Sequence, residues 1–353
     1  MKKVLRIIIL VIIVCMLAAS GGNAFEFKGF ADTSFSKSTK GADNIQYRNG
    51  SFAFGSVDLY FAESLEDVEL LSELIVTSSG NIIIERLYLG YVFRDELKVR
   101  VGRFHTPLGF WNTAYHHGRQ LQPTILRPEA LRFEFEGGIF PAHSVGVWLT
   151  GRSRTTAGKL DYGVEVTNGP KIVSSGNNKV LNSNNTSDNN TGKAVGFHAA
   201  ISPAVMENLK VGLSGHFARL ADDTGSAPVM EDLDQSVYAA AIMYSPGNIN
   251  ISGEYFAIGN KSQTDKKYNS NAYFGLITYA LTEEWVPYLL YDNMSIKEDD
   301  PYFIALNTMD VTKTTLGLRY NISYRSSVKG EVRAVEKGDN DWNEFALQWA
   351  LAF

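Results

Sequence analysis

Every second residue is apolar at the C-terminal end of this chain. The apolar positions are Phe345, Leu347, Trp349, Leu351 and Phe353, separated by Ala346, Gln348, Ala350 and Ala352. A two-residue period is that of a β-strand, whose side chains point alternately to two faces. An apolar face that ends in an aromatic residue is typical of a strand that lies between lipid and a polar interior. A half-buried edge strand of a soluble β-sandwich would show the same alternation.

The same alternation recurs along the chain, interrupted by turn signals. It predicts sixteen strands, over residues 25–35, 51–62, 68–77, 82–93, 97–104, 143–151, 160–167, 194–202, 209–218, 235–244, 249–258, 271–281, 285–295, 313–322, 327–336 and 342–353.

The connections between these strands differ in length in a regular way. Those after odd-numbered strands tend to be long, at 36–50, 105–142, 168–193, 219–234, 259–270 and 296–312. Those after even-numbered strands are short, as at 94–96, 245–248, 282–284 and 323–326. One end of the structure therefore has tight turns and the other has loops. We expect an all-β fold, a transmembrane antiparallel barrel of about 16 strands in which the first strand pairs with the last.

The first 24 residues have the features of a secretory signal peptide. Lys2, Lys3 and Arg6 precede an apolar run that ends in small residues, and this run is shorter than the roughly 20 residues of a membrane-spanning helix. We expect residues 1–24 to be removed and residues 25–353 to form an outer-membrane barrel. Cys15, the only cysteine, lies in the leader, so the mature chain has no disulfide framework.

Charge narrows the class of partner. Acidic residues outnumber basic ones, 38 to 33, and three of the basic residues lie in the leader. A net negative chain is a poor match for nucleic acid, so we expect no nucleic-acid partner.

Strand faces can be assigned where the alternation is clean. Leu87, Leu89, Tyr91 and Phe93 should face lipid, while Arg86, Tyr88 and Gly90 face the lumen. On the following strand, Val99 and Val101 should face out. The lumen-lining candidates are Arg86, Lys98 and Arg100, with further inward positions at Asp161, Glu165, His198, Lys210, His216, Glu254, Arg319, Lys329, Glu331, Arg333, Glu344 and Gln348. Mixed charge predicts a wet interior, because unpaired ions are costly in a dry core.

The longest connection, residues 105–142, carries many aromatic and aliphatic residues beside its charged ones. A solvated loop would not hold so many apolar side chains, so we expect it to fold into the lumen and constrict a pore. The candidate constriction residues are His105, His116, His117, Arg119, Arg127, Arg132 and Glu134. Residues 174–191, by contrast, are almost all small and polar, which predicts a mobile external loop.

Three segments resemble a known family. Residues 97–109, "LKVRVGRFHTPLG", their lead-in 85–91, "ERLYLGY", and residues 140–151, "FPAHSVGVWLTG", resemble the hallmark of the phosphate-selective porin (O/P type) family. That hallmark is Gly-Arg-Phe-x-x-Pro-x-Gly at the entry to a constricting third loop. The resemblance implies a sixteen-stranded homotrimeric porin in the outer membrane of a Gram-negative bacterium, forming a diffusion channel for small polar solutes or ions.

The loop departs from that family in its charges. His105 stands where lysine often follows the Phe, and residues 105–142 contain no lysine. Arg119, Arg127 and Arg132 are opposed by three glutamates, at positions 129, 134 and 136. The resemblance therefore implies a pore but not phosphate selectivity. The three arginines would favour anions modestly if they lie near the permeation path, and the alternative is that they pair with the glutamates and lock the loop.

Two other functions remain open on the sequence. A barrel could sheathe a partner protein, for example as an electron-transfer conduit, which would require a lumen free of the folded-in loop. A barrel lipase would require a lipid-facing Ser and His, and no nucleophile-elbow sequence is present. We expect no enzyme activity, no cofactor and no metal site, since the adjacent His116 and His117 point apart. The expected partners are outer-membrane lipid and lipopolysaccharide. The acidic loop residues are expected to be solvated, with divalent bridging to lipopolysaccharide as the alternative.

Overall fold

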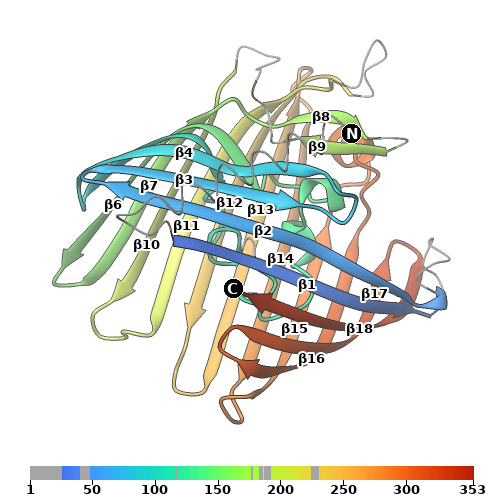
Figure 1. Ribbon diagram of the computed structural model, residues 1–353. Helices are drawn as coiled ribbons and strands as arrows, with labels where there is room; N and C mark the ends of the chain where they lie inside the picture. The colour runs from blue at the N-terminus through green and yellow to red at the C-terminus, as the bar shows by residue number, and fades with distance from the viewer. Residues whose placement is uncertain are drawn as a thin grey trace, which may run out of the picture.

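A computed structural model describes residues 26–39, 48–115, 118–175, 178–182, 186, 192–223 and 230–353. The sixteen predicted strands form one closed antiparallel barrel, in which each strand pairs with its neighbour in the chain and β1 pairs with β18 (Figure 1). The fold class predicted from alternation is confirmed. The predicted signal peptide, residues 1–24, lies outside the described residues.

The barrel strands are 9 to 15 residues long. They are β1 (Glu26–Ser38), β2 (Ser51–Leu65), β3 (Val68–Val76), β4 (Ile82–Arg94), β5 (Leu97–His105), β6 (His143–Thr155), β7 (Gly158–Thr167), β10 (Ala194–Pro203), β11 (Leu209–Leu220), β12 (Leu233–Tyr244), β13 (Ile249–Ser262), β14 (Lys267–Tyr279), β15 (Trp285–Ser295), β16 (Val311–Ser323), β17 (Ser326–Lys337) and β18 (Asn340–Ala352). A separate hairpin consists of β8 (Lys171–Ser175) and β9 (Asn178–Asn182).

The helical elements within the described ranges are short. These are α3 (Trp111–Ala114), η1 (Glu129–Leu131), η2 (Glu134–Glu136) and α4 (Pro301–Ala305). No helix in the described part of the chain is long and apolar enough to cross a membrane.

The two ends of the barrel sheet meet at the end with tight turns. Gly29 N–H donates to the Phe353 carbonyl over 2.8 Å, and Phe353 N–H donates back to the Gly29 carbonyl over 2.9 Å. The Phe353 ring lies over Gly29, where an added Cβ would be 2.4 Å from a ring carbon. Glycine at position 29 therefore makes room for the terminal aromatic residue that closes the barrel.

The outer face is apolar, as the alternation predicted. Leu87, Leu89, Tyr91 and Phe93 are all exposed on β4, and Val101 is exposed on β5. Arg86 lies on the inner side and pairs with Glu73 of β3. A register shift between β3 and β4 also places Glu85 inside, where it is buried. A continuous apolar outer surface without an open sheet edge is the arrangement that a bilayer requires.

Two predictions about loops were wrong. The connection predicted over residues 259–270 is shorter, because β13 and β14 continue and leave only residues 263–266 between them. Residues 174–175 and 178–182 of the polar segment 174–191, which was predicted to be a mobile external loop, lie in the β8–β9 hairpin, whereas residues 176–177, 183–185 and 187–191 lie outside the described residues. Ile172 and Leu181 are fully buried there and anchor the hairpin, with Ile172 bridged to Asp222 of the next loop.

The interior also differs from the predicted wet, charged lumen, because an apolar core fills part of it. Phe140 of the long connection packs on Phe256 of β13 with ring centroids 5.0 Å apart, and Trp111 packs edge-on against Phe274 of β14 at 5.4 Å. The β8–β9 hairpin and α4 add Leu181 and Tyr302 to the same cluster. Water is therefore excluded from the region between the long connection and β12–β15.

Candidate functional site

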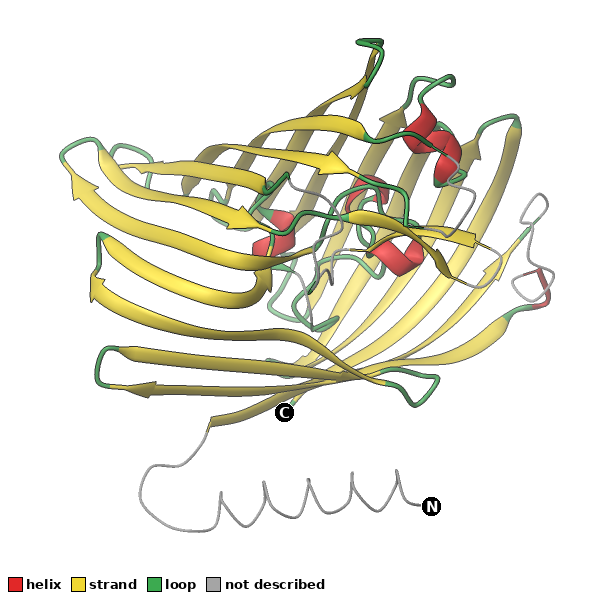
Figure 2. Cartoon of the chain, turned by 90° about the horizontal axis from the view of Figure 1, so that it is seen from above, coloured by secondary structure: helices red, strands yellow, loops and turns green. Residues whose placement is uncertain are grey.

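The described residues of the segment 106–142, which we name the constriction loop, fold into the barrel. Figure 2 shows helical turns inside the ring of strands. Backbone N–H groups of Phe110 and Trp111 donate to Glu254 Oε1 of β13, over 3.0 and 2.6 Å. Gly109 has a φ of +70°, and a Cβ there would be 1.8 Å from Glu254 Oε2, so only glycine fits this approach. The start of the loop is thus tied to the wall opposite its own strand.

A buried ion pair fastens the middle of the loop. Lys313 Nζ on β16 donates to Glu129 Oε2 of η1 over 2.5 Å, and Arg132 Nη1 donates to Glu129 Oε1 over 2.9 Å. Burial alone would raise the pKa of Glu129, but Lys313 and Arg132 outweigh it and hold that pKa well below its usual range. Glu129 therefore stays ionised at neutral pH and joins the loop to the barrel wall.

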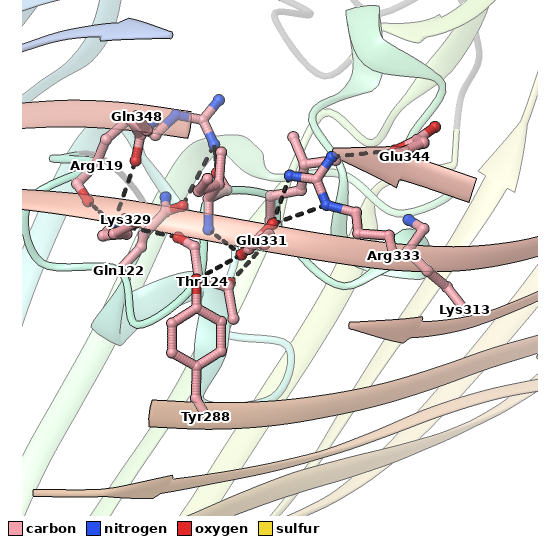
Figure 3. Close-up of polar contacts among 12 residues, drawn as sticks. Arg119, Gln122, Thr124, Tyr288, Lys313, Lys329, Glu331, Arg333, Glu344 and Gln348 are labelled. Carbon is pink, nitrogen blue, oxygen red and sulfur yellow. Dashed lines mark hydrogen bonds and ion pairs between the residues drawn. The ribbon is translucent and has the colours of Figure 1, made fainter. Parts of the chain in front are cut away.

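A second set of anchors comes from β17 (Figure 3). Lys329 is fully buried, and its Nζ donates to the carbonyls of Arg119 and Thr124 over 2.5 and 3.2 Å. Glu331 accepts from the backbone N–H of Ile125 over 2.7 Å and from the Tyr288 hydroxyl over 2.8 Å. Because these charged groups bind loop backbone, they position the loop and do not line open water.

The three loop arginines have different surroundings. Arg127 is 2% exposed; it donates to the Leu131 carbonyl and to Asn112 Oδ1, and its guanidinium lies over the Phe133 ring. The Arg119 side chain is 21% exposed and lies 3.6 Å from Glu136. The Arg132 side chain is 37% exposed beside Glu129. Arg119 and Arg132 can thus meet a solute, whereas Arg127 holds the loop together.

The other candidate residues lie at the base of the loop. His105 and His143 end β5 and begin β6, pair in register and have ring centroids 5.5 Å apart. His143 Nε2 is 2.8 Å from Glu85, and Glu134 accepts from the Ala142 N–H over 2.6 Å. His105, His143 and Glu134 are all buried. The remaining two candidates, His116 and His117, lie outside the described residues.

A chamber of about 400 Å³ remains between the loop and the wall from β5 to β12. Lys98 and Arg100 line it from β5, and Lys210 lines it from β11. Its charges are arranged in two groups that each share one acid: Lys98 and Arg100 contact Glu69, whereas Lys210 and Arg152 contact Asp161. Asp95 of the β4–β5 turn also lines the chamber, which therefore reaches the end with tight turns.

The chamber exists because the wall residues there are small. Ala200, Gly212 and Ala241 face inward on three neighbouring strands and line it. Alternation had placed Lys98, Arg100 and Lys210 inside. It could not show which inward residues the loop would cover, and so the chamber itself was missed, although a run of Gly and Ala at inward positions was the available signal.

Metal binding receives no support from the geometry. Across the residues that the structure describes, no group of three or more His, Cys, Asp or Glu side chains is placed to hold a metal ion.

Comparison with known proteins shows the fold. No family model matches the sequence, and no curated protein matches it. Solved structures do match: the anion-selective porin from Comamonas acidovorans superposes with a TM-score of 0.67 at 14% identity, covering 94% of this chain and 99% of that one. OmpT of Vibrio cholerae in its trimer form gives 0.64 at 12% identity, with 94% and 99% covered.

A third similar structure is the outer membrane channel DcaP of Acinetobacter baumannii. It gives a TM-score of 0.63 at 12% identity, covering 94% of this chain and 97% of that one. The chain therefore has the fold of the outer-membrane porins.

Proposed function

We propose that this protein is an outer-membrane porin, a water-filled diffusion channel for small polar solutes and ions. The observation that carries the proposal is the charged chamber between the constriction loop and the β5–β12 wall. A closed barrel with an apolar exterior fits a bilayer, and a lumen with charged side chains on a fixed loop fits selective permeation. The predicted leader, residues 1–24, supports export to the outer membrane.

A modest preference for anions is part of the proposal. Each of the two acid-sharing groups has one more positive than negative charge, since Glu69 contacts Lys98 and Arg100 and Asp161 contacts Lys210 and Arg152. Asp95 offsets one of these two excess charges, so the chamber remains positive overall. The partly exposed Arg119 and Arg132 of the loop add guanidinium groups that stay charged at any working pH. The anion-selective porin among the similar structures supports this direction.

The alternative of a barrel that sheathes a partner protein is not favoured. It requires an unobstructed lumen, and here the constriction loop is bound to β11, β13, β16 and β17 across that lumen.

We also propose a homotrimer in contact with outer-membrane lipid and lipopolysaccharide. The trimer form of the similar Vibrio cholerae protein supports the assembly, and the apolar outer face supports the lipid contact.

Planar-bilayer recordings on refolded mature protein test the function. We expect discrete conductance steps in KCl. Across a KCl gradient, the sign of the reversal potential should show that chloride is more permeant than potassium. Replacing Lys98 and Lys210 together by glutamine should move the reversal potential toward potassium. A barrel that folds and inserts but conducts nothing would refute the channel, and a reversal potential unchanged in the double variant would refute this source of selectivity.

A further inference from the structure

A row of charged residues crosses the outer face of the barrel at the end opposite the tight turns. Arg219, Asp234, Lys261 and Lys267 are direct cross-strand neighbours on β11, β12, β13 and β14, and we name them the cationic row. By strand alternation they share a face with Leu213 of β11, which is exposed. The cationic row therefore lies where the apolar outer wall ends and the headgroup region of a bilayer begins.

The cationic row can accept an anion. Arg219 donates to both carboxylate oxygens of Asp234, over 2.8 and 3.2 Å, and Lys261 lies 2.5 Å from Asp265 of the β13–β14 turn. These side chains are partly exposed, and exposed ion pairs contribute little to stability. Lys261 and Lys267 stand directly opposite each other, where like charges repel. A group with several anionic oxygens between them would relieve that repulsion.

Small and neutral polar residues lie next to the cationic row on the same face. The next two outward rows across β11–β14 are Phe217, Ser236, Gly259 and Asn269, then Gly215, Tyr238, Ala257 and Asn271. Phe217 and Tyr238 pack edge to face at 5.3 Å, whereas a Cβ on Gly259 would have no atom nearer than 3.8 Å. The surface over β13 is therefore open, with hydroxyl and amide groups on the strands beside it.

An apolar hollow of about 760 Å³ lies farther along the same strands. Its lining includes the outward residues Leu213, Ala240, Gly253, Tyr255 and Tyr273. Tyr273 is six positions after Lys267. Six residues of a tilted strand descend roughly 15 Å, about half of the hydrocarbon thickness of a bilayer. An acyl chain that extends from a headgroup at the cationic row would therefore reach the hollow.

We propose that the outer face of β11–β14 binds lipopolysaccharide directly, through a phosphate of its lipid A. The phosphate would bind Arg219, Lys261 and Lys267. The sugar would lie beside Ser236 and Asn269, and an acyl chain would occupy the hollow. This proposal rests on the proposed outer-membrane channel, whose loop end would lie in the outer leaflet, and it names the lipid contact of that channel. Direct binding by cations requires no divalent bridge.

Native mass spectrometry of detergent-folded protein with diphosphorylated lipid A, in the presence of EDTA, tests the site without requiring conduction. We expect lipid A to stay bound. Lys261→Gln/Lys267→Gln should bind it about ten-fold more weakly, because each lysine attracts the anionic headgroup. Gly259→Leu, which fills the open surface over β13, should weaken binding about five-fold although every cation remains.

A matched control is Arg154→Gln/Lys159→Gln, which removes another directly opposed pair of cations, at the tight-turn end. It should leave lipid A affinity unchanged. Phosphatidylglycerol, an anionic lipid without a sugar, should bind at least about five-fold more weakly than lipid A. Equal lipid A affinity in the wild-type protein and the double lysine variant would overturn the site, as would loss of wild-type binding in EDTA or equal affinity for phosphatidylglycerol. Trimers that dissociate in Gly259→Leu at unchanged lipid A affinity would make this face a subunit contact and also overturn the site.

The site and the channel can fail separately. Lys261→Gln/Lys267→Gln should conduct like the wild-type protein in planar bilayers, because both side chains lie outside the barrel. A conducting protein whose lipid A affinity does not depend on these lysines would refute the site and leave the channel intact. Binding that depends on both lysines in a barrel without conductance would support the site and refute the channel.

Discussion

Lys313 of β16 and Glu129 of the constriction loop form a buried ion pair in which Nζ and Oε2 are 2.5 Å apart. The two residues are far apart in sequence and join the inner wall of the barrel to the loop. This pair is one of several contacts that fix the loop to the wall, beside those of Glu254, Lys329 and Glu331.

Glu129→Gln should loosen the loop at neutral pH. Removing one member of a buried pair leaves the other charge uncompensated, which costs about 3 kcal/mol. We expect frequent brief closures in single-channel records at pH 7. Lys266→Gln, which removes an exposed ion pair with Asp299, is the control and should show no more brief closures than the wild-type channel. If Glu129→Gln closes no more often than Lys266→Gln, the Lys313–Glu129 pair does not hold the loop.

The same pair predicts a pH dependence. The pKa of Glu129 is lowered in the folded protein, so its stabilisation of the loop is complete above the ordinary glutamate pKa of about 4.3 and is lost as the pH falls below it. Current noise should therefore be the same at pH 7 and pH 5 and should rise by pH 3. A rise between pH 7 and pH 5 would point to other groups.

Arg127 and Arg132 should respond differently to substitution. Arg127→Met removes the donor to Asn112 and to the Leu131 carbonyl inside the loop, so we expect a lower unfolding temperature, with about 2–3 kcal/mol lost. Arg132→Gln should cost less stability than Arg127→Met, because Lys313 still pairs with Glu129, and it should shift the reversal potential toward cations, because the Arg132 side chain is partly exposed. Thermal melts in detergent and bilayer recordings separate the two effects. The assignment fails if Arg127→Met alters ion preference and leaves the melting temperature as it was.

Closure of the barrel depends on Phe353. Deleting this residue removes two backbone hydrogen bonds to Gly29 and the ring that covers it. We expect reduced yield of heat-modifiable barrel on unheated gels, and a similar loss for Gly29→Val, whose side chain would collide with the ring. Gly275→Ala is the control, since nothing lies within 4 Å of a Cβ there. If the Phe353 deletion and Gly29→Val both give undiminished yield, barrel closure does not depend on the contact between Phe353 and Gly29.

The barrel could be predicted from sequence because its alternation follows directly from the chemistry of its two faces. Leu89 and Phe93 meet lipid, whereas Arg86 and Lys98 meet polar partners, so a two-residue period marks the strands and their inner side. The segments that join the strands were less predictable. The β8–β9 hairpin escaped detection because its polar composition concealed the two residues, Ile172 and Leu181, that bury it.

The candidate site was predicted only in outline. The alternation of apolar and polar residues cannot identify the inner face of a strand when both faces are apolar. On β14, Phe274 faces the internal core and Tyr273 faces outward. The apolar core was therefore missed. The sequence of the loop also could not separate the buried Arg127 from the accessible Arg132, because their difference arises from contacts with distant residues.

The most direct test of a water-filled path beside a fixed loop uses a single cysteine in the chamber. The predicted mature chain has no cysteine, so Lys210→Cys introduces a unique thiol inside the barrel, and Leu213→Cys, on the same strand, introduces one on the outer face, where Leu213 is 64% exposed. A small water-soluble methanethiosulfonate added to open channels should reduce the conductance of Lys210→Cys in steps and leave Leu213→Cys unchanged. An open Lys210→Cys channel whose conductance does not respond, although mass spectrometry shows that the thiol is modified, would contradict a permeation path through this chamber.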